Sequence, residues 1–294
     1  MAATLLLTLV TAAWGSSFFL TRDLVATIPS ADYLAVRFAL AASVMLPLLH
    51  RHVRALDRQQ LLVGAGLGIV YGVAQLLQTV GLEHTTATRS GFITGMYVVL
   101  TPAFAALVLR ARLTGSTWLA SLTALAGLAA LSLGSVGWGL GESLTLASAA
   151  VFAVHILWLG YASRDGATLG LAAVQVTACA VVCALAAVPD GVRTPTTPSG
   201  WAVLVYLALV CGAAAMWAQT WAQAHLRPTR AAIVMTTEPL FAALFATWVG
   251  GESLTARLAL GGGLILAAMY LSELGPRARR GATPPEALHH GPGG

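Results

Sequence analysis

The segment PLFAAL at residues 239–244 nearly repeats PAFAAL at residues 102–107, and this echo decides how the fold is interpreted. The two copies begin 137 residues apart in a chain of 294 residues. Another echo keeps the same order: Gln78-Thr79 recurs as Gln219-Thr220, 141 residues later. Echoes in one order at nearly one offset indicate that the second half of the chain is a duplicate of the first.

Apolar residues dominate both halves of the chain. Hydrophobic residues make up 57% of the sequence and charged residues 9%, and the mean hydropathy is +0.80. A soluble domain carries roughly a quarter charged residues, so most of this surface must face lipid. A spanning helix needs about 20 apolar residues. The sequence predicts an all-α membrane protein with ten transmembrane helices, near residues 3–22, 33–49, 60–82, 90–110, 115–135, 142–162, 167–188, 200–223, 229–249 and 255–274.

The duplication and the ten segments together predict an inverted architecture. Each half holds five spans, an odd number, so the second copy must enter the membrane from the opposite side. We expect two inverted five-helix repeats, at 1–137 and 138–274, with a solute site near the midplane between them. The tail at 275–294, which is rich in Pro and Gly, is expected to be disordered.

The distribution of basic residues predicts the orientation in the membrane. All sixteen are Arg, and with the N-terminus inside, eleven of them fall in the even-numbered loops and the tail. Short Arg-rich loops stay in the cytoplasm, so we expect a multi-pass protein of the bacterial inner membrane with both termini cytoplasmic. Loop Arg residues also account for the net charge of +5, and no nucleic-acid partner is expected beside membrane lipid and a small-molecule substrate.

Short motifs in both halves add a more specific indication. They are WGSSF at 14–18, AVRF at 35–38, TTATRSGFIT at 85–94, TEPLFA at 237–242 and GESL at 251–254. In these motifs the chain resembles the EamA family of the drug/metabolite transporter superfamily, from residue 1 to about residue 274. The resemblance implies ten helices in two inverted five-helix repeats and transport of small metabolites, often outward. The halves differ in two places: Thr101 stands where the second half has Glu238, and the Gly-Glu of 251–252 has no counterpart after the fourth segment.

Glu238 is the most informative polar residue, because it lies inside an apolar segment. A charged group at the centre of a span costs roughly 2.5–3.5 kcal/mol on insertion scales, so Glu238 should face a cavity or a partner. It either couples transport to protons or cations, or contacts substrate, or it holds helices together through hydrogen bonds. Pro239 leaves the carbonyl of Met235 without its helical hydrogen bond. Pro102 does the same to Val98, which makes the two prolines candidate hinges.

Other polar side chains in the segments are candidates for the same site. Arg37 either binds an anionic or carboxylate-bearing substrate or extends to the outer interface. Its counterpart in the second half, at an offset of 138, is Gln175, so this charge belongs to one half only. Gln78 and Gln219 are related by the repeat and are expected to line a cavity, because amides within a span need polar partners.

Aromatic residues and one histidine complete the candidate set. Aromatic walls favour an apolar, aromatic or cationic solute, and the candidates are Trp14, Tyr97, Trp158 and Trp217. A Trp near the interface also serves simply as an anchor in the headgroups. His155 in mid-span either titrates during transport or is a hydrogen-bonded structural residue.

The remaining patterns bound the class of function. The sequence lacks a nucleotide-binding motif, His-Glu-x-x-His, Gly-x-Ser-x-Gly and a paired intramembrane Asp, so neither an enzyme nor a cofactor or metal site is expected. We expect a secondary active transporter that exports small metabolites or drug-like solutes by alternating access. The alternatives are a facilitative channel and a non-transport sensory component of the membrane.

A glycine series predicts a close helix contact. Gly64, Gly68 and Gly72 fall on one helical face, where small side chains let backbones approach. The first interpretation is packing against another helix of the same chain, and the second is a homodimer.

Overall fold

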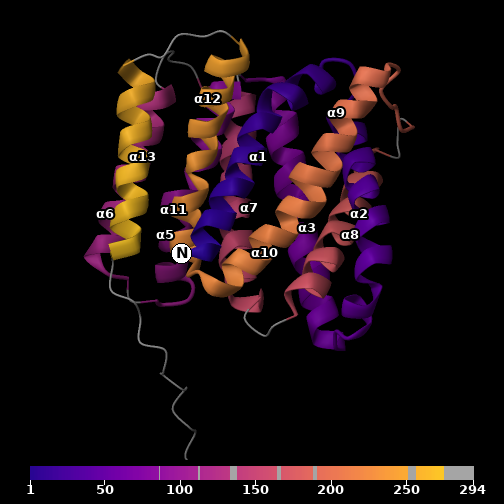
Figure 1. Ribbon diagram of the computed structural model, residues 1–294, viewed down its shortest axis with the longest axis horizontal. Helices are drawn as coiled ribbons and strands as arrows, with labels where there is room; N and C mark the ends of the chain where they lie inside the picture. Colours follow the sequence, from indigo (N-terminus) through magenta and orange to yellow (C-terminus); the bar gives the residue numbers. More distant parts are fainter. Residues whose placement is uncertain are drawn as a thin grey trace, which may run out of the picture.

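The computed structural model describes residues 1–85, 87–111, 113–132, 138–163, 167–187, 191–250 and 256–274. Across these residues every regular element is helical and there is no strand. The helices are roughly parallel or antiparallel to one another and form a bundle with short connections (Figure 1). The predicted tail at 275–294 and the GESL motif at 251–254 lie outside the described residues.

The first half of the chain forms six helical pieces. α3 begins with a capping box, in which the Asp57 side chain accepts from the Gln60 amide at 2.7 Å and the Gln60 side chain accepts from the Asp57 amide at 3.0 Å. α4 and α5 follow one another with a single residue between them. In order the helices are α1 (Ala2–Val25), α2 (Ser30–Arg54), α3 (Arg58–Glu83), α4 (Ala87–Gly95), α5 (Tyr97–Leu107) and α6 (Gly115–Ser132).

The second half repeats this order with one addition, a π-helical turn. Pro198 and Pro228 stand at the first positions of α9 and α11, where a missing N–H is harmless. The elements are α7 (Leu140–Ala162), α8 (Thr168–Ala187), α9 (Pro198–Ala208), the π-helical turn Leu209–Ala214, α10 (Ala215–His225), α11 (Pro228–Met235), α12 (Thr237–Gly250) and α13 (Ala256–Leu274).

Six helical segments in the described part are long and apolar enough to cross a membrane. They are Ser30–Arg54, Arg58–Glu83, Arg89–Leu107, Leu140–Ala162, Thr168–Ala187 and Pro198–His225, and shorter apolar helices cover Ala2–Ser17, Gly115–Ala130 and Ala259–Leu271. Each of the ten predicted segments lies largely within a helix or a broken helix. Within the described residues, length and apolarity alone single out six of them.

Surface and interior have the polarity that a lipid solvent demands. Large apolar side chains such as Leu9, Ile69 and Leu185 are exposed, whereas Arg37 and His155 are buried. In hydrocarbon, buried polar groups must find partners inside the bundle or line a cavity. The chain is therefore built as a multi-pass membrane protein.

The glycine face of α3 packs within the chain. A Cβ atom added at Gly64 would lie 2.9 Å from a methyl carbon of Val174, and one added at Gly72 would lie 3.1 Å from the Cβ atom of Val182, both on α8. α3 and α8 are in extensive contact. The expected packing against another helix of the same chain is confirmed, and the homodimer stays a prediction.

Two helices are interrupted at equivalent points of the two halves. Met96 separates α4 from α5, and Thr236, 140 residues later, separates α11 from α12. At each break the amide bonds to the carbonyl three residues earlier, Met96 to Ile93 at 3.1 Å and Thr236 to Ile233 at 3.2 Å. The chain thus makes one tight turn and then resumes its helix.

The two breaks precede the prolines that the sequence marked as hinges. α5 continues through Pro102, six residues after its break. Pro239 is the third residue of α12, in a first turn whose N–H groups have no helical partner in any case. The interruptions therefore lie at Met96 and Thr236, and the hinge role of the prolines stays a prediction.

Candidate functional site

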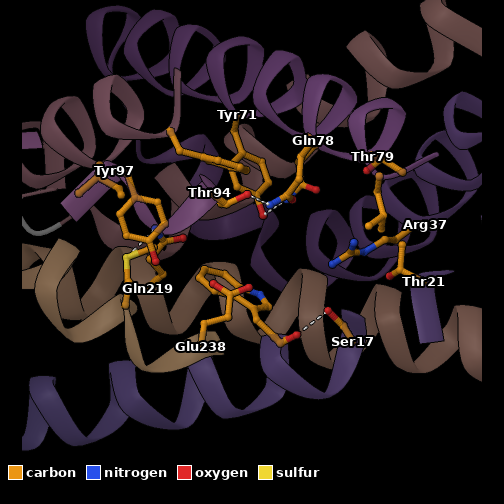
Figure 2. A pocket seen from close by; sticks show the side chains of 16 residues that line it. Ser17, Thr21, Arg37, Tyr71, Gln78, Thr79, Thr94, Tyr97, Gln219 and Glu238 are labelled. Carbon is orange, nitrogen blue, oxygen red and sulfur yellow. Dashed lines mark hydrogen bonds between the residues drawn. The ribbon is translucent and has the colours of Figure 1, made fainter. Parts of the chain in front are cut away.

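A cavity lies among the helices of both halves. Its empty space, including its mouth, is about 720 Å³. The aromatic part of its wall consists of Trp14, Tyr71, Tyr97 and Phe152, and the hydroxyl and amide part consists of Ser17, Thr21, Gln75, Gln78, Thr79, Thr94 and Gln219. Arg37 and Glu238 add one charge of each sign (Figure 2).

The cavity is asymmetric along the bundle. We call the end at which α1 begins the proximal end and the end at which it finishes the distal end. The lining residues of α1 run from Trp14 to Thr21 and those of α3 from Tyr71 to Leu82, which are the distal parts of both helices. The cavity thus extends from the middle of the bundle toward the distal end.

Close contacts fill the bundle on the proximal side of the cavity. The hydroxyl oxygens of Thr11 on α1 and Thr237 on α12 share a buried hydrogen bond of 2.7 Å. A Cβ atom added at Gly160 on α7 would lie 2.6 Å from the ring of Pro228 at the start of α11. The Gln223 amide donates to the Ile156 carbonyl at 3.3 Å, joining α10 to α7. These contacts hold α1, α7, α10, α11 and α12 close together on the proximal side of the cavity.

Arg37 is held rigidly in the wall. Its guanidinium donates to the Tyr33 hydroxyl at 3.0 Å and to the carbonyl oxygens of Leu207 and Cys211 at 3.2 and 3.4 Å. It also lies 5.2 Å from the centre of the Phe38 ring. The residue is only 5% exposed, and within the described residues no carboxylate pairs with it. A buried cation without a nearby anion is costly, so the site favours an incoming negative group.

One backbone acceptor of Arg37, the Cys211 carbonyl, lies in the π-helical turn, and the other, the Leu207 carbonyl, lies at the end of α9 just before it. The Cys211 carbonyl within this turn also accepts the Trp14 indole N–H at 2.9 Å. The wider turn therefore ties α1 and α2 to the helix that carries Gln219. π-turns recur at functional sites, and no residue pattern that we can identify marks this one.

Glu238 projects into the cavity from the start of α12. It is the second residue after the break at Thr236, where unsatisfied N–H groups and the helix dipole favour a negative charge. In the part of the chain that is described, its carboxylate has no hydrogen bond and no ion pair. This favours the cavity-facing interpretation of Glu238 over the interpretation in which it joins helices.

Two further polar atoms of the wall lack partners. The Tyr97 hydroxyl and the Gln219 carbonyl oxygen are buried and form no hydrogen bond with any described residue. The other amides of the wall are engaged. Gln78 donates to the Thr94 hydroxyl at 3.0 Å, and Gln75 donates to the Tyr71 hydroxyl at 2.8 Å. In Figure 2, Tyr97 and Gln219 lie at the same end of the cavity as Glu238, and Arg37 lies at the other.

The structure brings six of the nine predicted substrate-site residues together. The six that line the cavity are Trp14, Arg37, Gln78, Tyr97, Gln219 and Glu238. His155 lies behind the wall, where its Nε2 atom is 2.9 Å from the Gln175 amide oxygen and its ring centre is 5.1 Å from that of Tyr71. Trp158 and Trp217 are 36% and 39% exposed on the outside of the bundle, where anchoring in lipid is the simpler role.

Sequence reasoning missed part of the α3 wall, although a signal was present. Tyr71, Gln75, Gln78 and Leu82 follow the spacing i, i+4, i+7, i+11, which places them on one helical face. Phe152 on α7 also lines the cavity. It carried no signal, since nothing in an apolar helix distinguishes an aromatic residue that faces a cavity from one that faces lipid.

A second polar cluster closes the distal end of α7 against α4. The Arg89 guanidinium pairs with the Glu142 carboxylate at 2.9 Å, and the Thr85 hydroxyl donates to the same oxygen at 2.6 Å. The other carboxylate oxygen accepts the Gly139 amide at 2.9 Å. We call Thr85, Arg89, Gly139 and Glu142 the distal cluster.

A polytopic helical bundle with a charged, aromatic-walled cavity is typical of membrane transport proteins, and comparison with known proteins agrees. The chain matches the model of the EamA-like transporter family over residues 1–133 and 139–274, and it belongs to that family. The resemblance that the motifs indicated is thereby confirmed. An uncharacterized transporter of Archaeoglobus fulgidus is 31% identical over 268 residues, which span 91% of this chain and 84% of that protein.

A solved crystal structure shares the fold. It superposes with a TM-score of 0.76 over 93% of this chain and 96% of the other, at 18% sequence identity. The chain is accordingly a transporter of the EamA-like family, with helices that cross the membrane several times.

Proposed function

We propose that the chain is a secondary active transporter that exports small metabolites or drug-like solutes across a bacterial inner membrane. The observation that carries the proposal is the shape of the cavity: charged and polar side chains from both halves surround a space that is closed proximally and extends distally. A pore would need a continuous polar path, whereas a carrier needs a site with one closed end.

Contacts between the halves support ten spans arranged as two inverted repeats, at 1–137 and 138–274. α2 contacts α8 and α6 contacts α13, so two equivalent pairs meet across the seam. α1 contacts α10 and α12, while its equivalent, α7, contacts α3 and α5. Exchanging the halves thus reproduces the pattern of contacts, as a twofold axis in the membrane plane requires.

Alternating access follows from the same arrangement. α1 packs against α12 toward the distal end, and the equivalent contact, α7 against α5, lies toward the proximal end (Figure 1). Loosening the proximal contact while tightening the distal one would move the mouth of the cavity to the other end without moving its walls far. With both termini in the cytoplasm, as the Arg distribution favours, the conformation described here faces outward.

Glu238 is our candidate for coupling transport to protons or cations. Glu238→Gln removes the charge and keeps the shape, so we expect the variant to insert but to lose transport or its dependence on pH. Flux is measured between pH 5.5 and 8.5 in proteoliposomes, beside Trp217→Phe, which lies outside the cavity. Arg37 and the hydroxyls of Tyr71 and Tyr97 are the other ionisable groups in the wall, and flux that is normal and independent of pH in Glu238→Gln would contradict coupling.

Counterflow tests the proposed class of function. The purified chain is reconstituted into liposomes that are loaded with unlabelled solute, and uptake of labelled solute is followed for amino acids, amines and aromatic metabolites. A carrier gives saturable uptake that is accelerated by solute on the other side. An unsaturable leak would instead indicate a channel, and the absence of flux for every solute would favour a sensory component. We propose no catalytic activity.

A further inference from the structure

The two charges of the cavity do not follow from the duplicated architecture. Gln175 stands in the second half where Arg37 stands in the first, and Thr101 stands in the first half where Glu238 stands in the second. Both counterparts are neutral and buried in helices of the same fold. The fold therefore forms without a charge at either position, and the charges require another explanation.

The Glu238 end of the cavity is rich in acceptors that lack donors. The Glu238 carboxylate has no partner among the described residues, and neither has the buried amide oxygen of Gln219. The ring of Tyr97 lies at the same end of the cavity (Figure 2), and the ring of Trp14 is also part of the cavity wall. Several acceptors next to aromatic rings fit a protonated amine, which offers N–H donors and a positive charge.

The Arg37 end has the opposite character. A guanidinium has five N–H groups, and three hydrogen bonds hold that of Arg37 against Tyr33, the end of α9 and the π-helical turn. The remaining N–H groups have no partner in the described structure, and Figure 2 shows the guanidinium pointing into the cavity. A planar, immobilised guanidinium suits a carboxylate.

We propose that the cavity binds a zwitterion, a solute that carries a carboxylate and a protonated amine, with its apolar or aromatic part against the aromatic wall. The carboxylate meets Arg37, and the ammonium meets Glu238 and Gln219. Within the described residues Arg37 and Glu238 form no ion pair with each other, so each is available to a ligand. The inference rests on the proposed transport function and names its class of substrate.

Matched solutes test the inference on the unaltered chain. Three solutes share a phenyl ring and differ in charge. L-Phenylalanine carries both the carboxylate and the amine, 3-phenylpropanoate carries only the carboxylate, and 2-phenylethylamine carries only the amine. L-Leucine is a second zwitterion without a ring. Each is tested in proteoliposomes for saturable counterflow and for competition. A solute that lacks one of the two charged groups should need a concentration at least about tenfold higher for half-saturation. A single-charge solute that is accepted as well as the zwitterions would overturn the proposal.

Two variants assign the ends of the ligand. Glu238→Gln should weaken the binding of the zwitterions and of the amine, but it should leave competition by 3-phenylpropanoate nearly unchanged. Arg37→Gln, which installs the residue of the second half, should do the reverse. Arg37→Lys keeps the charge and should retain part of the affinity, which guards against a misfolded Gln variant. The exposed Trp217→Phe is the control. Equal losses for all solutes in both charge variants would contradict the assignment.

The outcomes separate this inference from the proposed function. Saturable counterflow of the amine alone, of the acid alone or of an uncharged metabolite would leave a carrier but exclude a zwitterion site. If the two zwitterions fail to compete with a solute that is transported, a carrier likewise remains but a zwitterion site is excluded. Absence of saturable flux for every solute of the wider screen would remove both the inference and the function on which it rests.

Discussion

Gly15 is a point of close approach between α1 and α12. A Cβ atom there would lie 2.7 Å from the Cβ atom of Phe241, 2.8 Å from the Ala242 nitrogen and 2.9 Å from the Glu238 carbonyl oxygen. Two of these neighbours are backbone atoms, which cannot move aside independently. The contact involves Glu238, whose carboxylate we place in the binding site. The absence of a side chain at Gly15 therefore affects both the contact between the helices and the site.

Gly15→Ala is therefore expected to separate the two helices and to impair transport. Overpacking of this kind costs typically about 1–3 kcal/mol, and thermal unfolding in detergent measures it. Gly263→Ala on α13 is the matched control, because nothing lies within 4 Å of a Cβ atom there. A Gly15→Ala variant as stable and as active as the Gly263→Ala variant would show that the contact between the helices is not as close as described.

The site residues that could be predicted from the sequence are mainly the polar residues that stand within apolar segments. Polar groups within a span need polar partners or a cavity. Four residues stood out for this reason, and all four line the cavity: Arg37, Gln78, Gln219 and Glu238. Aromatic residues gave mixed results. Trp14 lines the cavity but Trp158 is exposed, since both positions suit an aromatic ring and only packing decides which face turns inward.

At the scale of elements, the two broken helices and the π-helical turn position the site. The break at Thr236 places Glu238 in a first helical turn, and the turn at Leu209–Ala214 presents the Cys211 carbonyl oxygen to Arg37. The sequence predicted helical segments well because apolar length determines them. It located hinges at prolines, whereas the breaks lie at Met96 and Thr236, where no residue type marks them.

The hydrogen bond between Thr11 and Thr237 gives the contact between α1 and α12 a measurable strength. Thr11→Val and Thr237→Val each remove one hydroxyl, and a buried hydrogen bond contributes about 0.5–1.5 kcal/mol. The double variant should lose less stability than the sum of the single variants, because the bond is removed only once. Thermal unfolding of the four proteins measures this coupling. Strict additivity would mean that the two hydroxyls do not interact.

The distal cluster should stabilise the contact between α4 and α7. Arg89→Gln and Glu142→Gln are each expected to lower Tm modestly, because the pair is partly accessible to solvent and salt screens it. Exchanging the charges, with Arg89→Glu and Glu142→Arg together, should restore part of the loss relative to either single reversal. If the exchanged protein is no more stable than the single reversals, the cluster is not held by charge pairing.

At the scale of the whole molecule, the lipid-facing surface and the polar interior are those of a membrane transporter. Apolar side chains cover the outside of the bundle, and the charged groups converge on one cavity whose walls come from both halves. The three cysteines of the chain are buried and free, within the residues described. A new cysteine in the cavity wall can therefore be labelled against a quiet background.

Labelling of Ser17→Cys by a membrane-impermeant thiol reagent tests the central claim, a cavity that alternates between the two sides. Ser17 lies in the cavity wall on the distal part of α1. The measurement compares right-side-out with inside-out vesicles, with the parent chain as control. We predict labelling from the periplasmic side that a transported solute slows, and slower labelling from the cytoplasmic side. Equal rates from both sides that no solute changes, or no labelling from the periplasm, would contradict the account.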